Sequence, residues 1–120
     1  MSTQMQNEEK IHWTVMIRSA PGSEGAPVLH ALRTAIAALA DEIAVSVFFV
    51  EEAVSVLRQE ASVTHPVHQD LLAEIRELQG EILAIVQPGS NPGPFLPGVK
   101  IGNMASLVRS MKASDQVISF

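Results

Sequence analysis

Short apolar runs rich in β-branched residues alternate along this chain with longer segments in which apolar residues recur every three or four positions. The short runs are typical of buried strands, whereas the three- and four-residue spacing is typical of one face of a helix. The predicted strands are Ile11–Ile17, Ile43–Val50, Glu81–Val86, Val99–Ile101 and Gln116–Phe120. The second of them is almost continuously apolar, which predicts a central parallel strand covered on both faces.

Helices are predicted in the segments between these strands. The first begins at Pro27, a residue suited to the first position of a helix, and continues for roughly four turns. A short helix is predicted directly after the second strand, and two longer ones follow later in the chain. These three helices cover Glu51–Gln59, Val67–Leu78 and Met104–Met111. Gly80 is expected just past the end of one helix, and Asn103 is expected to cap the start of the last.

This order of elements predicts the fold class. Strands that alternate with helices at this spacing form βαβ units, which build a parallel sheet with helices on both faces. We therefore predict an α/β protein with a single three-layer α/β/α domain and a mostly parallel five-stranded sheet. The domain covers residues 11–120, and residues 1–10 form a flexible lead-in. An all-helical alternative would place Ile43–Val50 and Glu81–Val86 in helices, against their β-branched and Phe content.

Charge and composition limit the classes of partner. The 120 residues contain 8 Lys and Arg against 13 Asp and Glu, a net charge of −5. Because nucleic-acid binding needs clustered basic residues, the sequence argues against a nucleic-acid partner. No apolar run approaches the length of a membrane span, and the polar first ten residues do not resemble a signal peptide, which predicts a cytoplasmic protein without a membrane partner. The hydrophobic content of 47% is high for so small a chain and predicts self-association.

A loop rich in Pro and Gly follows the strand Glu81–Val86. Seven of the twelve residues in Gln87–Gly98 are Pro or Gly. In open parallel sheets, the loops at the carboxyl ends of strands surround the ligand-binding crevice, so a stiff loop here predicts one wall of a site. The candidate ligand- or partner-binding residues of the loop are Gln87, Ser90, Asn91 and Phe95. We also expect Phe95 and Leu96 to be exposed and to pack on a neighbouring subunit.

Two other strand ends carry candidate residues. Glu51 and Glu52 follow the second strand, where paired carboxylates can act as acid and base, although they can equally well stabilise the start of the next helix. Ser19 and Ser23 lie in the turn between the first strand and the first helix, where an anion could bind the helix N-terminus. Neither nucleotide-binding glycine motif is present, and Glu24 would repel an anion, which favours an ordinary tight turn.

The histidines are weaker candidates. His65, His68 and Asp70 have the composition of a metal site, but two imidazoles and one carboxylate fall short of a defined ligand set, which favours a solvated loop end. We expect His12 and Trp13 on the first strand to serve in packing. The sequence thus identifies no cofactor and no catalytic residue with a complete constellation around it.

Four segments carry a resemblance to a known family. They are VMIRSAPGSEGAPVLHAL, VSVFFVEEAVSVL, ILAIVQPGS and GVKIGNMASLVRSMKASDQVISF, and their order and spacing extend from Ile11 to Phe120. In these segments the chain resembles the DsrE/DsrF-like sulfur-relay family. The resemblance implies a five-stranded parallel-sheet domain that assembles as homotrimers or hexamers and, in many members, carries persulfide sulfur on a Cys at the end of the strand that corresponds to Glu81–Val86.

The sequence departs from the family at this sulfur-carrying position. Gln87 and Pro88 stand there, and the chain contains no Cys at all. Because a thiolate is needed to attack a sulfane donor and to hold the sulfur, this chain cannot carry persulfide. We therefore expect a non-catalytic oligomeric protein with an accessory or binding role, possible protein partners and no cofactor. The alternative is a small enzyme or metal-binding protein that uses Glu51 and Glu52 or the pair His65 and His68.

Overall fold

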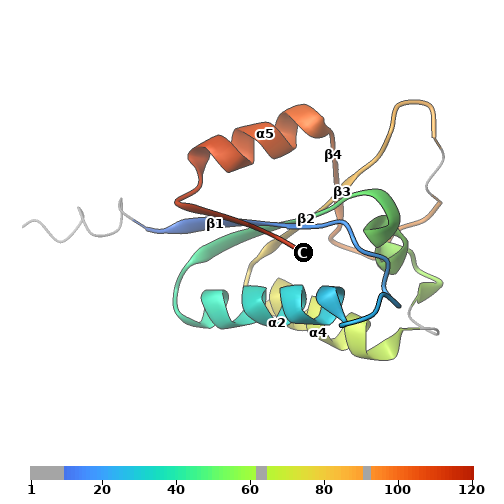
Figure 1. Cartoon of the computed structure of the whole chain (residues 1–120), viewed down its shortest axis with the longest axis horizontal. Coiled ribbons are helices and arrows are strands. Elements are labelled where there is room, and N and C mark those ends of the chain that lie inside the picture. Colours follow the sequence, from blue (N-terminus) through green and yellow to red (C-terminus); the bar gives the residue numbers. More distant parts are fainter. Residues whose placement is uncertain (1–9, 62–64, 91–92) are drawn as a thin grey trace, which may run out of the picture.

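A computed structural model describes residues 10–61, 65–90 and 93–120. Within these ranges, the expected alternation of strands and helices is present (Figure 1). The strands are β1 (His12–Ile17), β2 (Ala44–Phe49), β3 (Glu81–Ile85), β4 (Lys100–Gly102) and β5 (Gln116–Ser119). The helices are α2 (Pro27–Ala40), the 3-10 helix η1 (Glu51–Leu57), α4 (Pro66–Glu77) and α5 (Met104–Ala113). The predicted lead-in falls almost entirely outside the described residues.

The five strands form one parallel sheet in the order β4-β3-β2-β1-β5. The apolar strand β2 lies in the centre, as its sequence predicts. Its residue Phe49 is level with Ile17 of β1 and with Ala84 of β3. The predicted three-layer α/β/α fold with a parallel sheet is therefore confirmed.

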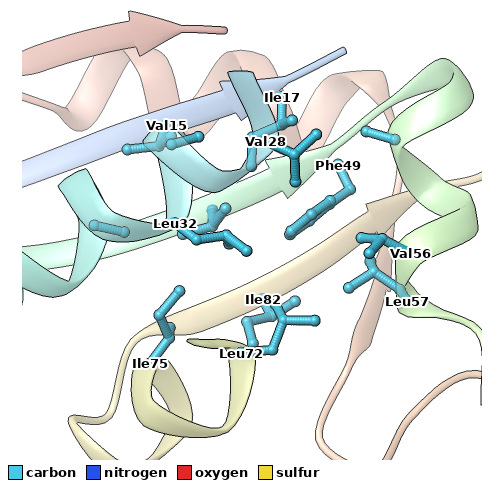
Figure 2. Packing of buried hydrophobic residues seen from close by; sticks show 14 of the residues in the cluster. Val15, Ile17, Val28, Leu32, Phe49, Val56, Leu57, Leu72, Ile75 and Ile82 are labelled. Atoms are coloured by element: carbon cyan, nitrogen blue, oxygen red, sulfur yellow. The ribbon is translucent and has the colours of Figure 1, made fainter. Parts of the chain in front are cut away.

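The helices cover the two faces of the sheet unequally. Helices α2 and α4 lie side by side against one face, whereas α5 lies against the other (Figure 1). The large core lies on the α2 and α4 side, where Val15, Leu32, Phe49 and Ile75 are inaccessible to solvent (Figure 2). A smaller core under α5 is built from Phe48, Val50 and Leu107. The side of the molecule that carries α5 is therefore the less completely covered one.

The end of α4 shows why Gly80 is required. Gln79, and not Gly80, takes the left-handed conformation, with φ at 69°. The amide of Gly80 donates to the carbonyl of Ile75, and the amide of Gln79 donates to that of Arg76, which is the Schellman arrangement. A Cβ at Gly80 would lie 2.8 Å from Cγ2 of Ile75 and 2.9 Å from Cδ1 of Leu39. Gly80 follows the helix as expected. Glycine is required there because a side chain would clash with its neighbours, and not because of a left-handed backbone.

The start of α5 agrees with the prediction. The side chain of Asn103 accepts a hydrogen bond from the amide of Ser106, and the hydroxyl of Ser106 accepts one from the amide of Asn103. This reciprocal capping box satisfies two backbone donors at the helix start. None of the helices in the described ranges has the length and apolar character needed to cross a membrane.

Candidate functional site

Three of the predicted site positions lie at one edge of the sheet. Ser19 follows β1, Glu51 follows β2 and Gln87 follows β3. Because these neighbouring strands are parallel and in register, their carboxyl ends meet at the same edge. The topology therefore brings the three loops together, as the sequence predicts, and a role in binding stays a prediction.

The paired carboxylates Glu51 and Glu52 are both exposed in the first turn of η1. Within the described ranges, neither side chain makes a hydrogen bond or an ion pair. Glu51 has a φ of 54°, a left-handed conformation that is uncommon for a residue with a long side chain. Both carboxylates are thus exposed to solvent, and their two negative charges lie next to each other at the helix start.

In the Pro/Gly loop, Ser90 folds back on Gln87. Its amide and its hydroxyl both donate to the carbonyl of Gln87, at 3.1 Å and 2.8 Å. The side chains of Gln87 and Ser90 lie at an exposed surface. Asn91, the third candidate in this loop, lies outside the described residues. The described part of the loop is therefore a tight turn whose hydroxyl is already engaged by the backbone.

The expectation that Phe95 and Leu96 are an exposed pair is wrong. Both are half-buried and pack against the large core of their own chain. The amide of Leu96 donates to the carbonyl of Leu57 at 2.9 Å, and Phe95 forms an antiparallel bridge with Arg58. The amide of Gln59 also donates to Pro94. The end of the loop thus pairs with the chain just after η1, which satisfies its backbone groups and brings its apolar side chains inward.

The turn before α2 is held mainly by its backbone. The amide of Ser23 donates to Ala20, and the amide of Ala26 donates to Ser23. Ser19 and Ser23 are half-buried, and α2 has no side-chain cap at Ala26, which takes a left-handed conformation. These contacts describe the tight turn that the sequence favours over an anion site.

The histidine pair is present, but no third ligand accompanies it among the described residues. The rings of His65 and His68 are 5.3 Å apart and nearly perpendicular. His68 is buried, and in the described part of the chain its Nε2 has no hydrogen-bond partner. Burial lowers the pKa of the His68 imidazole, and the charge of His65 lowers it further. Asp70 is exposed, and no group of three metal-ligating side chains occurs among the described residues.

A polar network lies at the opposite, amino-terminal edge of the sheet, at a place where the sequence pattern predicts no site. His12 of β1 is its centre: Nε2 lies 3.0 Å from the hydroxyl of Ser46, and Nδ1 lies 2.9 Å from the hydroxyl of Ser114. Ser46 in turn donates to Glu81 at 2.9 Å, and Lys100 donates to the same carboxylate at 2.9 Å. The network thus crosses four neighbouring strands on the α5 face.

Each hydroxyl that contacts the His12 ring has a second partner. The hydroxyl of Ser114 also lies within hydrogen-bond distance of the carbonyl of Ser110, and that of Ser46 donates to Glu81. Both ring nitrogens of His12 thus have a hydroxyl partner, with donor and acceptor roles that depend on the tautomer. Thr14, which is fully buried, joins the network through its contacts with Ser110 and Ser114.

The carboxyl group of Glu81 is tuned by the same contacts. The hydrogen bond from Lys100 lowers the pKa of Glu81 most, and the hydrogen bond from Ser46 and the charges of Lys100 and His12 act in the same direction. Partial burial opposes them. Because Ser46 is only 4% exposed, a substrate cannot reach its hydroxyl. The network consequently acts as a clamp between α5 and the sheet, and not as a nucleophile with its base.

A weak signal for this network exists in the sequence. His12 and Thr14 alternate with Trp13 and Val15, which places the two polar side chains on the same face of β1. Trp13 packs against the core as expected. For His12, packing alone was the expectation, and the structure adds specific hydrogen bonds to it. Ser46 is likewise the single polar residue within an apolar strand. Its partners lie on neighbouring strands, so the sequence does not identify them before the strand order is known.

Comparisons with known proteins agree with this fold. No family model matches the chain. The uncharacterized protein MJ0989 of Methanocaldococcus jannaschii is 33% identical over an alignment of 115 residues, and the match covers 90% of this chain and 98% of that protein. The crystal structure of the ychN protein from E. coli superimposes with a TM-score of 0.77 over 92% of this chain and 99% of that one, at 21% identity. The latter similarity concerns the fold alone, which is DsrE-like.

The relationship to MJ0989 extends over nearly the full length of both chains, and the similarity to ychN likewise covers most of each chain. The chain therefore belongs to the same family as MJ0989 of Methanocaldococcus jannaschii, and it has the DsrE-like fold.

Proposed function

We propose that this chain is a non-catalytic, self-associating binding protein, related to sulfur-relay proteins but unable to carry persulfide. The observation that carries the proposal is the incompletely covered side of the molecule that bears α5. Among the described residues, α5 is the single helix on this face of the sheet, whereas α2 and α4 cover the other (Figure 1). A second copy of the chain would complete the layer.

Three exposed apolar side chains lie on this side. Met104 and Val108 lie one turn apart on α5 and are 62% and 52% exposed. Val117 of β5 is level with Thr14 of β1 and therefore lies on the α5 face of the sheet. It is 44% exposed at the free edge of β5. We call Met104, Val108 and Val117 the α5 patch. Exposed apolar side chains on the less covered side support self-association, and a trimer or hexamer is what the resemblance to the sulfur-relay family implies.

The absence of Cys supports the non-catalytic part of the proposal. None of the 120 residues is Cys, and Gln87 and Pro88 follow β3 at the position where many relatives of the sulfur-relay type hold sulfur. A partner protein or ligand would bind at the carboxyl edge beside Gln87 and Ser90, which are exposed there.

The oligomeric state of a matched pair of variants tests this proposal. Val108→Glu places a charge in the α5 patch, whereas Val67→Glu places the same charge on α4, where Val67 is 50% exposed on the other side of the sheet. Light scattering at micromolar concentration is expected to show a trimer or hexamer for the native chain and for Val67→Glu, and a monomer for Val108→Glu. A monomeric native chain, or dissociation by Val67→Glu alone, would overturn the proposal.

The alternative function, an enzyme or metal-binding protein that uses Glu51 and Glu52 or the histidines, is tested on the same purified protein. Glu51→Gln and His65→Ala would each change ligand or metal binding if that hypothesis holds. Because both carboxylates are solvated, the enzyme or metal-binding hypothesis is less well supported than the binding role.

A further inference from the structure

A small cavity lies under the sheet between α4, β3 and the end of the Pro/Gly loop. Its volume is about 40 Å³, and its walls include Leu72 of α4, Ile82 of β3 and Leu96 of the loop. Only two of its lining residues, Gln69 and Arg76, are polar. A cavity of this kind holds about three water molecules, or a similar number of carbon atoms. The cavity is thus mainly apolar, with polar side chains at two positions.

The unusual connection from β3 to β4 explains why the space is there. Parallel strands are usually connected through a helix, but the described residues between β3 and β4, 86–90 and 93–99, contain none. The extended end of the loop covers this part of the core instead, fixed by the hydrogen bond from Leu96 to Leu57. An extended chain fills less volume than a helix, and the cavity remains beside α4.

Arg76 supplies a positive charge at this cavity. It is exposed in the last turn of α4, and among the described residues its guanidinium forms no ion pair and no hydrogen bond through its side chain. Gly98 lies against it: a Cβ at Gly98 would come within 2.8 Å of Nε of Arg76. The other polar side chain, Gln69, uses its amide nitrogen to bind the carbonyl of Val56. Arg76 is therefore the cavity's free charged donor.

From this arrangement we infer that the cavity binds a short-chain aliphatic carboxylate, with the alkyl chain inside and the carboxylate on Arg76. Apolar lining favours the alkyl chain, and the planar guanidinium can bind a carboxylate through two parallel hydrogen bonds. The volume matches a chain of about three carbon atoms beyond the carboxylate, as in butyrate. This inference adds a ligand class to the binding role and does not depend on self-association.

A series of ligands on the native protein tests the inference by NMR titration of backbone amides. Acetate, propionate, butyrate, 1-butanol and butylammonium are compared. Each methylene added from acetate to butyrate is expected to lower the Kd about fourfold, because each buried methylene contributes about the same transfer free energy. Hexanoate should gain nothing further, because the cavity is full. Saturable shifts around Leu72 and Leu96, with butyrate at least tenfold tighter than 1-butanol, are the expected result.

Two variants separate the charge from the cavity. Arg76→Gln should weaken butyrate about tenfold and leave 1-butanol unchanged, whereas Arg33→Gln, on the exposed surface of α2, should change neither. Ala73→Leu fills the cavity from an exposed lining position, which keeps the core intact, and should abolish binding of both. Absence of saturable shifts with butyrate, or an affinity for 1-butanol or butylammonium equal to that for butyrate, would overturn the inference. Because light scattering reports self-association separately, either proposal can fail alone.

Discussion

The hydroxyl of Ser46 lies 3.0 Å from Nε2 of His12, although 34 positions separate the two residues in the sequence. Their strands are neighbours in the sheet, and His12 also reaches Ser114 at the end of α5. This imidazole thus joins two strands and the helix that covers them. Removing the imidazole takes one hydrogen-bond partner from the hydroxyl of Ser46 and one from that of Ser114.

We therefore expect His12→Phe to lower the free energy of unfolding by about 1–3 kcal/mol, because it removes two hydrogen bonds that each contribute about 0.5–1.5 kcal/mol. Urea denaturation monitored by circular dichroism measures this change. His30→Phe is the matched control, because His30 is exposed on α2 and should have an effect near zero. Equal stability of the native chain and His12→Phe would mean that the network contributes nothing to the fold.

The buried imidazole of His68 predicts a pH dependence of stability. Its pKa is lowered in the folded protein, so the unfolded chain takes up the proton at a higher pH than the folded chain does. As the pH falls through the ordinary histidine value, stability should decrease, and the decrease should end once the folded protein also binds the proton. The slope should be smaller in His68→Phe and unchanged in His30→Gln, as measured by urea denaturation between pH 8 and about pH 5. A native slope retained in His68→Phe would contradict this assignment.

The left-handed conformation of Gln79 predicts a stabilising substitution. Glycine adopts this conformation without steric cost, so Gln79→Gly should raise the free energy of unfolding by about 0.5–1 kcal/mol. Gly80→Ala, one residue later, should do the opposite, because its Cβ would meet Ile75 and Leu39. Thermal denaturation of the two variants checks both signs. Destabilisation by Gln79→Gly would show that its side chain contributes more than the backbone strain costs.

Zinc should bind weakly at the histidine pair. His65 and His68 offer two imidazoles, and no third ligating side chain accompanies them in the described part of the chain. Structural zinc sites use four ligands, so equimolar zinc should leave the melting temperature unchanged within about 1 °C. Differential scanning fluorimetry measures the shift, with His65→Ala as the control. A larger shift that His65→Ala removes would show that the pair does bind metal.

The sequence alone was sufficient for the order of the elements and the fold class. Ile43–Val50 predicted the central strand, since a nearly continuous run of apolar, β-branched residues is typical of a parallel strand that is covered on both faces. Pro27 and Asn103 marked the helix starts correctly, because caps depend on local backbone chemistry. The absence of Cys is likewise evident from the sequence without any coordinates. These are local properties, which neighbouring residues along the chain decide.

Tertiary structure decided the position of the loop end and the contacts of the polar residues. Phe95 and Leu96 look like an exposed pair in the sequence, but pairing of their backbone with Leu57 and Arg58 directs them inward. The network around His12 depends on which strands are neighbours, and the cavity beside Arg76 depends on a connection without a helix. Such contacts join residues far apart in the sequence, so they exist only after the whole sheet has assembled.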